Sequence, residues 1–246
     1  MTIAGLNPHD QLARDIAFFV GEHVPTPFGI DFVGVVNALG PHVSTFNVGD
    51  AVFGNGDMFV GDYMATQEYA IMDVNFMGRI PASITQDEAA TMPLNVLTMY
   101  IALFYPSIHA IPLPLTPEGK SFDYKNTPLA IIGAGSKCGH FAIQLARWAG
   151  FGTIIAIAGK TKAEHLRELG ATHLIDRTLS DDEIEAEVLS IIQTLGARIL
   201  SKNKKGTLVT VTHGEVDETK LNKRAGYELR HPHAAEKREL SVMLPR

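Results

Sequence analysis

The sequence of 246 residues contains a single cysteine, Cys138, and no long uninterrupted apolar run. One cysteine excludes a disulfide within the chain and any zinc site built from several cysteines, and it suits a reducing compartment, so we predict a cytoplasmic protein. The apolar runs are too short to cross a bilayer, and no signal segment is apparent at the start, so we expect no membrane partner. Acidic residues outnumber basic ones by 27 to 21, which leaves a net charge of −6 and argues against a nucleic acid partner.

The rest of the composition is typical of a globular protein, with 46% apolar and 20% charged residues. Residues 28–77 contain short branched or aromatic runs separated by glycine and turn residues, which predicts short antiparallel strands. Residues 84–104 favour two amphipathic helices, and the proline-rich residues 107–127 favour a connecting loop. We therefore predict a β module over residues 1–84 and a nucleotide-binding module with interdomain helices over residues 85–246.

A strand, a glycine turn, a helix and a second strand are predicted in succession over residues 129–159. The turn contains Gly133, Gly135 and Gly139. The first two lack a Cβ, which lets the backbone approach a pyrophosphate, and Gly139 lets the helix pack closely. The free N–H groups and dipole of the helix N-terminus favour an anion. Because the Gly-x-Gly-x-x-x-Gly spacing is one residue longer than the usual dinucleotide fingerprint, a tight turn without a ligand stays an alternative.

Three residues between these glycines, Ser136, Lys137 and Cys138, are assigned to the same cofactor site. For Cys138, a role as a small packing residue is the alternative. The site is expected to hold the phosphates of a dinucleotide beside the start of the helix.

The end of the second strand bears on which dinucleotide binds. An NAD site carries Asp or Glu there, about 20 residues after the glycines, to bind the ribose 2′-hydroxyl. This chain has Gly159, Lys160 and Lys162 instead, and the nearest acid, Glu164, is expected on the following helix. Because lysine ammonium groups suit a 2′-phosphate, we predict NADPH as the cofactor. Two solvated lysines at a helix start are the alternative.

Several further segments occur along the chain: GLNPHD at 5–10, GIDFVGVV at 29–36, FNVGDAVFG at 46–54, EAATMPLNVLTMYIALF at 88–104 and LGATHLIDRT at 169–178. Together with the glycine turn, they resemble the zinc-independent branch of the medium-chain dehydrogenase/reductase superfamily, the quinone-reductase and enoyl-reductase type. Fungal trans-enoyl-reductase-like members look most similar. The resemblance implies an α/β fold, in which an incomplete GroES-like β module precedes a Rossmann-type doubly wound parallel sheet.

The same resemblance bears on metal binding. Zinc alcohol dehydrogenases of this superfamily carry a cysteine ligand where Asn7 stands and a histidine where Ile30 stands. Neither residue is a good zinc ligand, so we predict no metal. His9 and the pair His231 and His233 remain as other candidate ligands, although no third partner at a suitable spacing accompanies them.

The resemblance also implies the chemistry. It points to NADPH-dependent reduction of an activated C=C bond in an enone, quinone or enoyl thioester, with a polyketide synthase as a candidate partner. Asn7 and His9 are the predicted catalytic residues, because an amide and an imidazole can bind the substrate oxygen or deliver a proton. Asn95 and Thr98 are predicted to contact the nicotinamide. A purely structural role in a polar cleft is the alternative for all four.

The chain departs from the family pattern in ways that affect the expected activity. Relative to the family pattern, the β module is shortened at its start, and the family's Rossmann strand between Leu189 and Thr194 is replaced by a sequence that continues as helix. The chain also ends before the family's return strands. The sequence therefore leaves open a second function, a catalytically inactive nucleotide- or partner-binding fragment of such a reductase, and it gives no oligomeric state.

Overall fold

The computed structural model describes residues 1–17, 25–57, 61–106, 111–196, 206–209 and 227–230. These residues form two compact units, Met1–Asn95 and the described residues from Val96 onward, and the boundary falls inside a helix. Each unit is described by itself. The predicted division at residues 84 and 85 concerns functional modules, and it stays a prediction.

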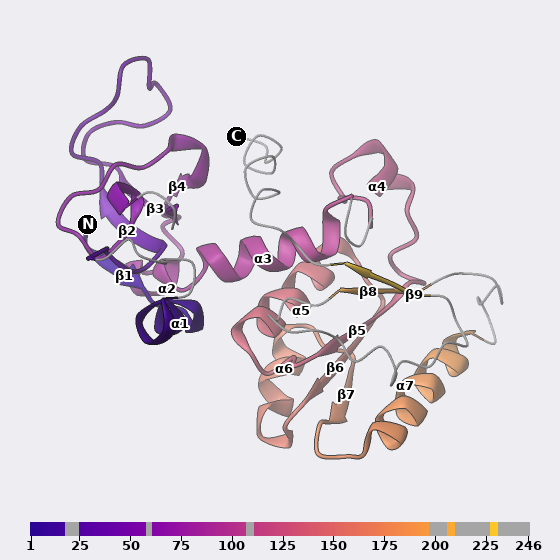
Figure 1. Cartoon of the computed structure of the whole chain (residues 1–246). Helices are drawn as coiled ribbons and strands as arrows, with labels where there is room; N and C mark the ends of the chain where they lie inside the picture. The colour runs from indigo at the N-terminus through magenta and orange to yellow at the C-terminus, as the bar shows by residue number, and fades with distance from the viewer. Residues whose placement is uncertain (18–24, 58–60, 107–110, 197–205, 210–226, 231–246) are drawn as a thin grey trace. The chain divides into compact units, whose positions relative to one another are not determined.

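The first unit contains a four-stranded antiparallel sheet in the order β1-β2-β3-β4 (Figure 1). Its strands are β1 (Ile3–Gly5), β2 (Asp31–Val35), β3 (Ala51–Asn55) and β4 (Met77–Arg79). Helix α1 (Pro8–Ile16) follows β1, and two short 3-10 helices, η1 (Gly61–Tyr63) and η2 (Val74–Phe76), precede β4. One apolar cluster of the unit consists of Phe32, Val36, Phe46, Val52 and Ala65. The predicted short antiparallel strands are confirmed.

Two helices follow β4, as the sequence predicts. Helix α2 (Gln86–Ala90) begins with a capping box in which Thr85 and Glu88 bind each other's backbone N–H groups. Helix α3 (Pro93–Phe104) comes directly after it. Strand β1 approaches α2 so closely that a Cβ on Gly5 would collide with the carbonyl oxygen of Ala90. This close approach places the start of α3 beside the polar residues of the first unit.

The second unit contains a parallel sheet in the order β5-β6-β7, with helices packed against it (Figure 1). Its elements are α4 (Pro117–Ser121), β5 (Pro128–Ile132), α5 (Lys137–Ala149), β6 (Thr153–Ala158), η3 (Lys160–Lys162), α6 (Ala163–Leu169), β7 (His173–Asp176) and α7 (Asp181–Gly196). Every residue of β6 is buried, so both faces of the sheet are covered at this strand. The predicted strand, turn, helix and strand over residues 129–159 are confirmed, and the helix begins at Lys137, before Gly139, which the prediction placed in the turn.

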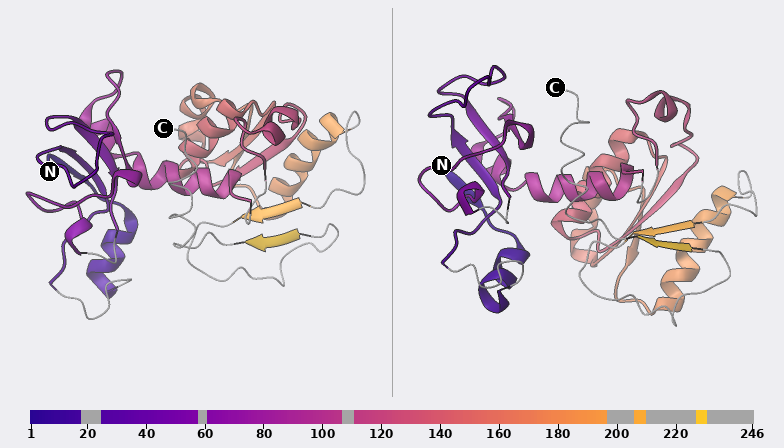
Figure 2. Two further views of the ribbon diagram at one scale, coloured as in Figure 1. Left: turned by 90° about the horizontal axis from the view of Figure 1, so that it is seen from above. Right: turned by 45° about the horizontal axis from the view of Figure 1, so that its top comes forward.

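Two further strands, β8 (Gly206–Val209) and β9 (Tyr227–Arg230), pair in parallel with each other (Figure 2). In the described residues they form a second sheet and do not extend β5-β6-β7. Residues 189–194 lie within α7, so the expectation that the chain runs on as helix there is confirmed. The α/β fold class is as predicted, but the described parallel strands form two sheets where one doubly wound sheet is typical of the Rossmann arrangement.

Within the described ranges, no helix has the length and the apolar character needed to cross a lipid bilayer.

Candidate functional site

The glycine turn after β5 has the geometry of an open phosphate cradle. Gly133 adopts φ +74°, and a Cβ there would meet nothing within 4 Å. The N–H of Ala134 donates to the carbonyl of Ile157 at 3.1 Å, which holds the turn against β6. Gly139 lies so close to the turn that a Cβ on it would be 2.5 Å from the Cα of Ala134. The turn is therefore held in place by β6 and α5, and the space next to Gly133 is open.

Ser136 begins helix α5 by accepting a hydrogen bond from the N–H of Gly139 at 3.0 Å. A Cβ on Gly135 would come within 3.7 Å of both the Cβ of Ala158 and the Cγ of Lys162. The structure thus brings the glycine turn and the segment after β6 together, as the cofactor prediction requires. The residues present fit a phosphate group, because the helix N-terminus, the open turn and a lysine side chain meet there.

Basic side chains lie close together around His140 on α5. The rings of His140 and His165 meet edge to face, with centroids 4.9 Å apart. Burial lowers the pKa of His140, and the nearby charges of His165, Lys137 and Lys162 lower it further. The sequence identified the two lysines but not the two histidines, since His140 and His165 come together only when α5 packs beside α6. Lys137 is exposed and Cys138 is half-buried.

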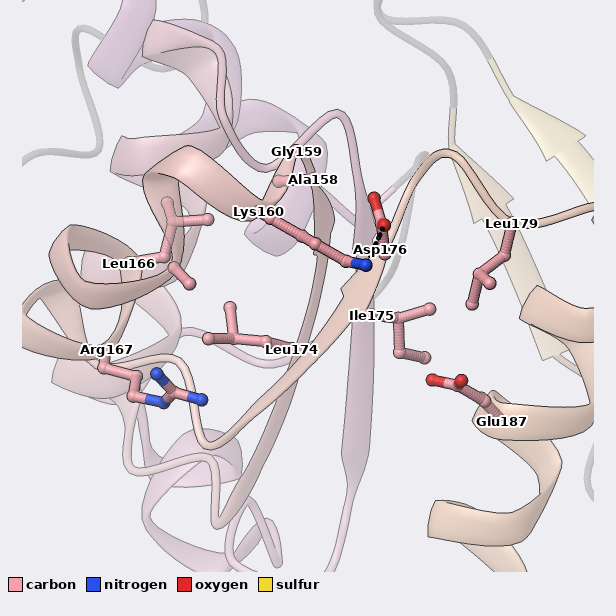
Figure 3. Close-up of a pocket in the computed structure, with 11 residues that line it drawn as sticks. Ala158, Gly159, Lys160, Leu166, Arg167, Leu174, Ile175, Asp176, Leu179 and Glu187 are labelled. Atoms are coloured by element: carbon pink, nitrogen blue, oxygen red, sulfur yellow. Dashed lines mark ion pairs between the residues drawn. The ribbon is translucent and has the colours of Figure 1, made fainter.

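A carboxylate lies beside Lys160, although the sequence suggested that none was available. The Nζ of Lys160 is 3.1 Å from the Oδ2 of Asp176, which comes from the end of the neighbouring strand β7. Both residues line a cavity of about 290 Å³, with Arg167 and Glu187 among its other charged residues (Figure 3). Hydrogen bonds from Thr178, and to a lesser extent from Lys160, lower the pKa of Asp176. The charge of Lys160 is therefore partly neutralised within the protein.

Arg177 is a further cation that the sequence analysis missed. A Cβ on Gly159 would lie 3.7 Å from the Nε of Arg177, so this exposed guanidinium is beside the segment that carries the lysines. Its backbone N–H donates to the carbonyl of Ala158 at 3.0 Å, which holds it at the end of β6. Only the parallel pairing of β6 with β7 brings it there.

The first unit contains a network of polar side chains around Asp31, at the start of β2. Asp31 is 1% exposed. Its Oδ2 accepts a hydrogen bond from the Nδ2 of Asn7 at 2.8 Å. Its Oδ1 accepts from the Nδ2 of Asn55 at 3.0 Å and from the N–H of Leu94 at 2.8 Å. Burial raises the pKa of Asp31 to about 6, and the nearby charge of Asp10 adds to this increase. The three hydrogen bonds act in the opposite direction and lower the pKa, but burial has the larger effect.

Asn7 also contacts a second residue that the sequence assigned to the site. The Nδ2 of Asn95 donates to the Oδ1 of Asn7 at 3.1 Å and to the carbonyl of Thr91 at 3.3 Å. Thr98 lies one turn after Asn95 on α3, in the part that belongs to the second unit. The structure therefore brings Asn7 and Asn95 together. The predicted roles of all the site residues stay predictions.

His9 lies beside a second buried carboxylate, Asp10. The Nε2 of His9 is 3.3 Å from the Oδ1 of Asp10. Asp10 also accepts hydrogen bonds from the backbone N–H of Asn7 at 2.7 Å and of Gly29 at 3.1 Å. Sequence reasoning missed Asp10 and Asp31. Asp31 could have been recognised from the sequence, because it stands directly before the apolar run FVGVV. A carboxylate that is buried with such a run needs hydrogen-bond partners.

Comparison with known proteins shows which families and structures this chain is similar to. Residues 1–98 match the alcohol dehydrogenase GroES-like domain family. The chain is 31% identical over 177 residues to the trans-enoyl reductase himH of Aspergillus japonicus, an alignment that covers 70% of this chain and 49% of that protein. It superposes on an alcohol dehydrogenase superfamily protein from Novosphingobium aromaticivorans with a TM-score of 0.68 and 26% identity, over 92% of this chain and 68% of that one. The chain belongs to the medium-chain dehydrogenase/reductase superfamily.

A third comparison concerns the cofactor. The chain shares its fold with a mycobacterial protein whose structure was determined in complex with NADPH, with a TM-score of 0.65 and 18% identity over 98% of this chain and 76% of that one. At this identity the likeness concerns the fold, and the NADPH complex is a property of that protein. The chain spans about half the length of the curated relatives it matches.

For a member of this superfamily, metal binding is decided by the donor set. In the described part of the chain, no three His, Cys, Asp or Glu side chains come together as a metal site would require. Ile30 is buried in the core of its unit, and Asn7 is hydrogen-bonded to Asp31 and Asn95. His231 and His233 lie outside the described residues. The expectation of no metal stays a prediction.

Proposed function

We propose that this chain is an NADPH-dependent reductase of an activated C=C bond in an enone, quinone or enoyl thioester, acting without a metal. One observation carries the proposal: the open turn at Gly133 and Gly135 meets the N-terminus of α5 and the side chain of Lys162. Its membership in a superfamily that includes enoyl reductases supports the choice of reaction. A polyketide synthase that delivers the thioester is the partner that this reading suggests.

The residues of the second unit would hold the cofactor. The positive dipole end at the start of α5 and the turn around Gly135 suit the pyrophosphate. Lys162 and Arg177 suit the 2′-phosphate, and neither has a carboxylate within ion-pair distance among the described residues. Lys160 contributes less, because Asp176 already faces it at 3.1 Å. A doubly charged phosphate is therefore favoured over a 2′-hydroxyl.

The residues of the first unit would act on the substrate. The bound cofactor supplies a hydride to the β-carbon of the conjugated system. The π pair of the C=C bond would then become a double bond between the α-carbon and the carbonyl carbon, while the carbonyl π pair moves to oxygen to give an enolate, and a proton added at the α-carbon would complete the reduction. Asn7 would donate a hydrogen bond to that oxygen, where negative charge develops. His9, held beside Asp10 at 3.3 Å, would supply the proton.

Binding and turnover measured separately test the proposal. The full chain is titrated with NADPH and NADH by fluorescence and is then assayed against small enones, quinones and enoyl thioesters. Tight NADPH binding with turnover of one of these classes supports the proposal. Binding without turnover would favour the inactive nucleotide-binding fragment, and absence of binding would overturn the cofactor site as well.

A further inference from the structure

The polar network of the first unit determines how the amide of Asn7 is oriented. A carboxylate can only accept hydrogen bonds, so Asp31 requires the Nδ2 end of Asn7 to face it, which it does at 2.8 Å. On the other side, the Nδ2 of Asn95 donates to the Oδ1 of Asn7 at 3.1 Å. The two neighbours thus impose the same orientation on the amide.

Each neighbour is itself fixed. Asp31 is held by the side chain of Asn55 on β3 and by the backbone N–H of Leu94 in the first turn of α3. Asn95 is held by the carbonyl of Thr91, to which its Nδ2 also donates. The orientation of Asn7 is therefore set by a β strand and a helix start, which are rigid elements.

The orientation leaves one hydrogen-bond donor of Asn7 for a ligand. The Nδ2 group carries two hydrogens, and Asp31 takes one. Among the described residues, no second acceptor for this nitrogen lies within hydrogen-bond distance, and Asn7 is only partly buried. With the amide reversed, the ligand side would present an oxygen, which would repel a developing enolate.

We propose that Asp31 is a positioning residue for the reaction, because it holds the amide of Asn7 with its second N–H free for the substrate oxygen. This inference rests on the proposed function. In this role Asp31 contacts neither substrate nor cofactor, because it acts through Asn7. Asp31 is 1% exposed, so burying its carboxylate costs desolvation free energy. An apolar residue at the same strand position would fill the space without that cost.

The test uses the full chain and the variant Asp31→Asn. This change keeps the shape of the side chain and leaves an oxygen for Asn55 and Leu94, but it turns an NH₂ group toward Asn7 and so favours the reversed amide. We expect kcat for enone reduction to fall about tenfold or more with KM for NADPH nearly unchanged. Asn7→Ala should show a similar loss, and the double variant should lose no more than either single variant, because both changes remove one oriented donor.

The matched control is Asp50→Asn. Asp50 is also a carboxylate of the first unit in a charged hydrogen bond, with Arg79 at 2.9 Å, but it makes no contact with Asn7. This variant should leave kcat unchanged. Losses from Asp31→Asn and Asn7→Ala that multiply in the double variant would overturn the proposal, as would an equal effect of the control.

A second measurement does not depend on turnover. In the ¹⁵N spectrum of the wild-type chain, the two side-chain N–H signals of Asn7 should be widely separated, because one hydrogen is bound to a carboxylate and the other is not. Asp31→Asn should bring these signals together or shift both, and Asp50→Asn should leave them in place. Unchanged Asn7 signals in Asp31→Asn would overturn the positioning role. If the wild-type chain reduces no substrate, the proposed function fails, while this spectrum still decides whether Asp31 orients Asn7.

Discussion

Lys160 at the end of β6 and Asp176 at the end of β7 form an ion pair with 3.1 Å between Nζ and Oδ2 (Figure 3). The pair lies where the ribose 2′ position of a dinucleotide is expected, since ligands of parallel sheets bind at the carboxyl ends of the strands. The negative charge of Asp176 therefore disfavours a 2′-phosphate and favours a 2′-hydroxyl. The positive charges of Lys162 and Arg177 favour a 2′-phosphate. We expect the balance between them to set the cofactor preference.

Removing the carboxylate should strengthen the preference for NADPH. In Asp176→Asn, Lys160 keeps its charge and loses its internal partner, so we expect Kd for NADPH to fall severalfold and Kd for NADH to rise or stay constant. Fluorescence titrations with both cofactors at fixed ionic strength check this. Weaker binding of NADPH would mean that Asp176 supports the site, for example by placing Lys160.

The lysines should differ in their contribution to binding. Replacing both Lys160 and Lys162 by alanine should weaken NADPH binding by roughly 1–3 kcal/mol, the range for hydrogen bonds to charged groups, and should leave NADH binding nearly unchanged. Lys162→Ala alone should cost more than Lys160→Ala, because only Lys160 is paired with Asp176. An equal loss for both cofactors would contradict a 2′-phosphate site.

NADPH binding should be sensitive to a side chain at Gly135 and insensitive to one at Gly40, which lies outside the cradle. In Gly135→Val, the Cβ would lie 3.7 Å from its nearest protein neighbours, so the chain should fold, while the branched side chain blocks the pyrophosphate. We expect thermal unfolding close to that of the wild type and no measurable NADPH binding. Gly40→Ala, at a site where a Cβ meets nothing closer than 3.9 Å, is the control. If the Gly135 variant bound NADPH normally, the phosphates would lie elsewhere.

Asp31 should make stability depend on pH in an unusual direction. Its pKa is raised from 3.8 to about 6 in the folded chain, so the folded state holds this proton more tightly than the unfolded state. The contribution of Asp31 to stability is full below pH 4 and decreases as the pH rises to about 6. The decrease is on the order of 3 kcal/mol.

Urea unfolding of the wild type and of Asp31→Asn between pH 4 and pH 7 measures this contribution. Other carboxylates with lowered pKa, such as Glu88 and Glu183, act in the opposite direction, so the difference between the two proteins is the relevant quantity. The difference should shift in favour of the variant as the pH rises. A difference that is constant with pH would show that Asp31 titrates alike in both states.

Removal of metal should have no effect. The family resemblance implies that Asn7 and Ile30 stand where zinc relatives carry ligands, and neither side chain is a good zinc ligand. After dialysis against a strong chelator, we expect reductase activity and the melting temperature to be unchanged. If activity were lost and stoichiometric zinc restored it, both the prediction of no metal and the proposed zinc-independent mechanism would be wrong.

Local patterns in the sequence were enough to predict much of the fold. The buried strand at residues 153–158 contains only branched residues and alanine, and the turn between β5 and α5 contains glycines, so both are recognisable without tertiary context. The capping box of Thr85 and Glu88 is equally local. These features depend on residues within a few positions of each other, where backbone propensity and side-chain spacing decide the outcome.

The content of the site depended on contacts between distant residues. Asp176 meets Lys160 because β6 and β7 pair in parallel, and Asp31 meets Asn7 and Asn55 because three segments converge on the start of β2. The sequence alone determined that a glycine turn begins a helix after a buried strand and that Asn7 stands near the start of the chain. Only the tertiary structure decided which charges face each other and which end of the Asn7 amide is free, because electrostatic and hydrogen-bond partners are set by distances in space.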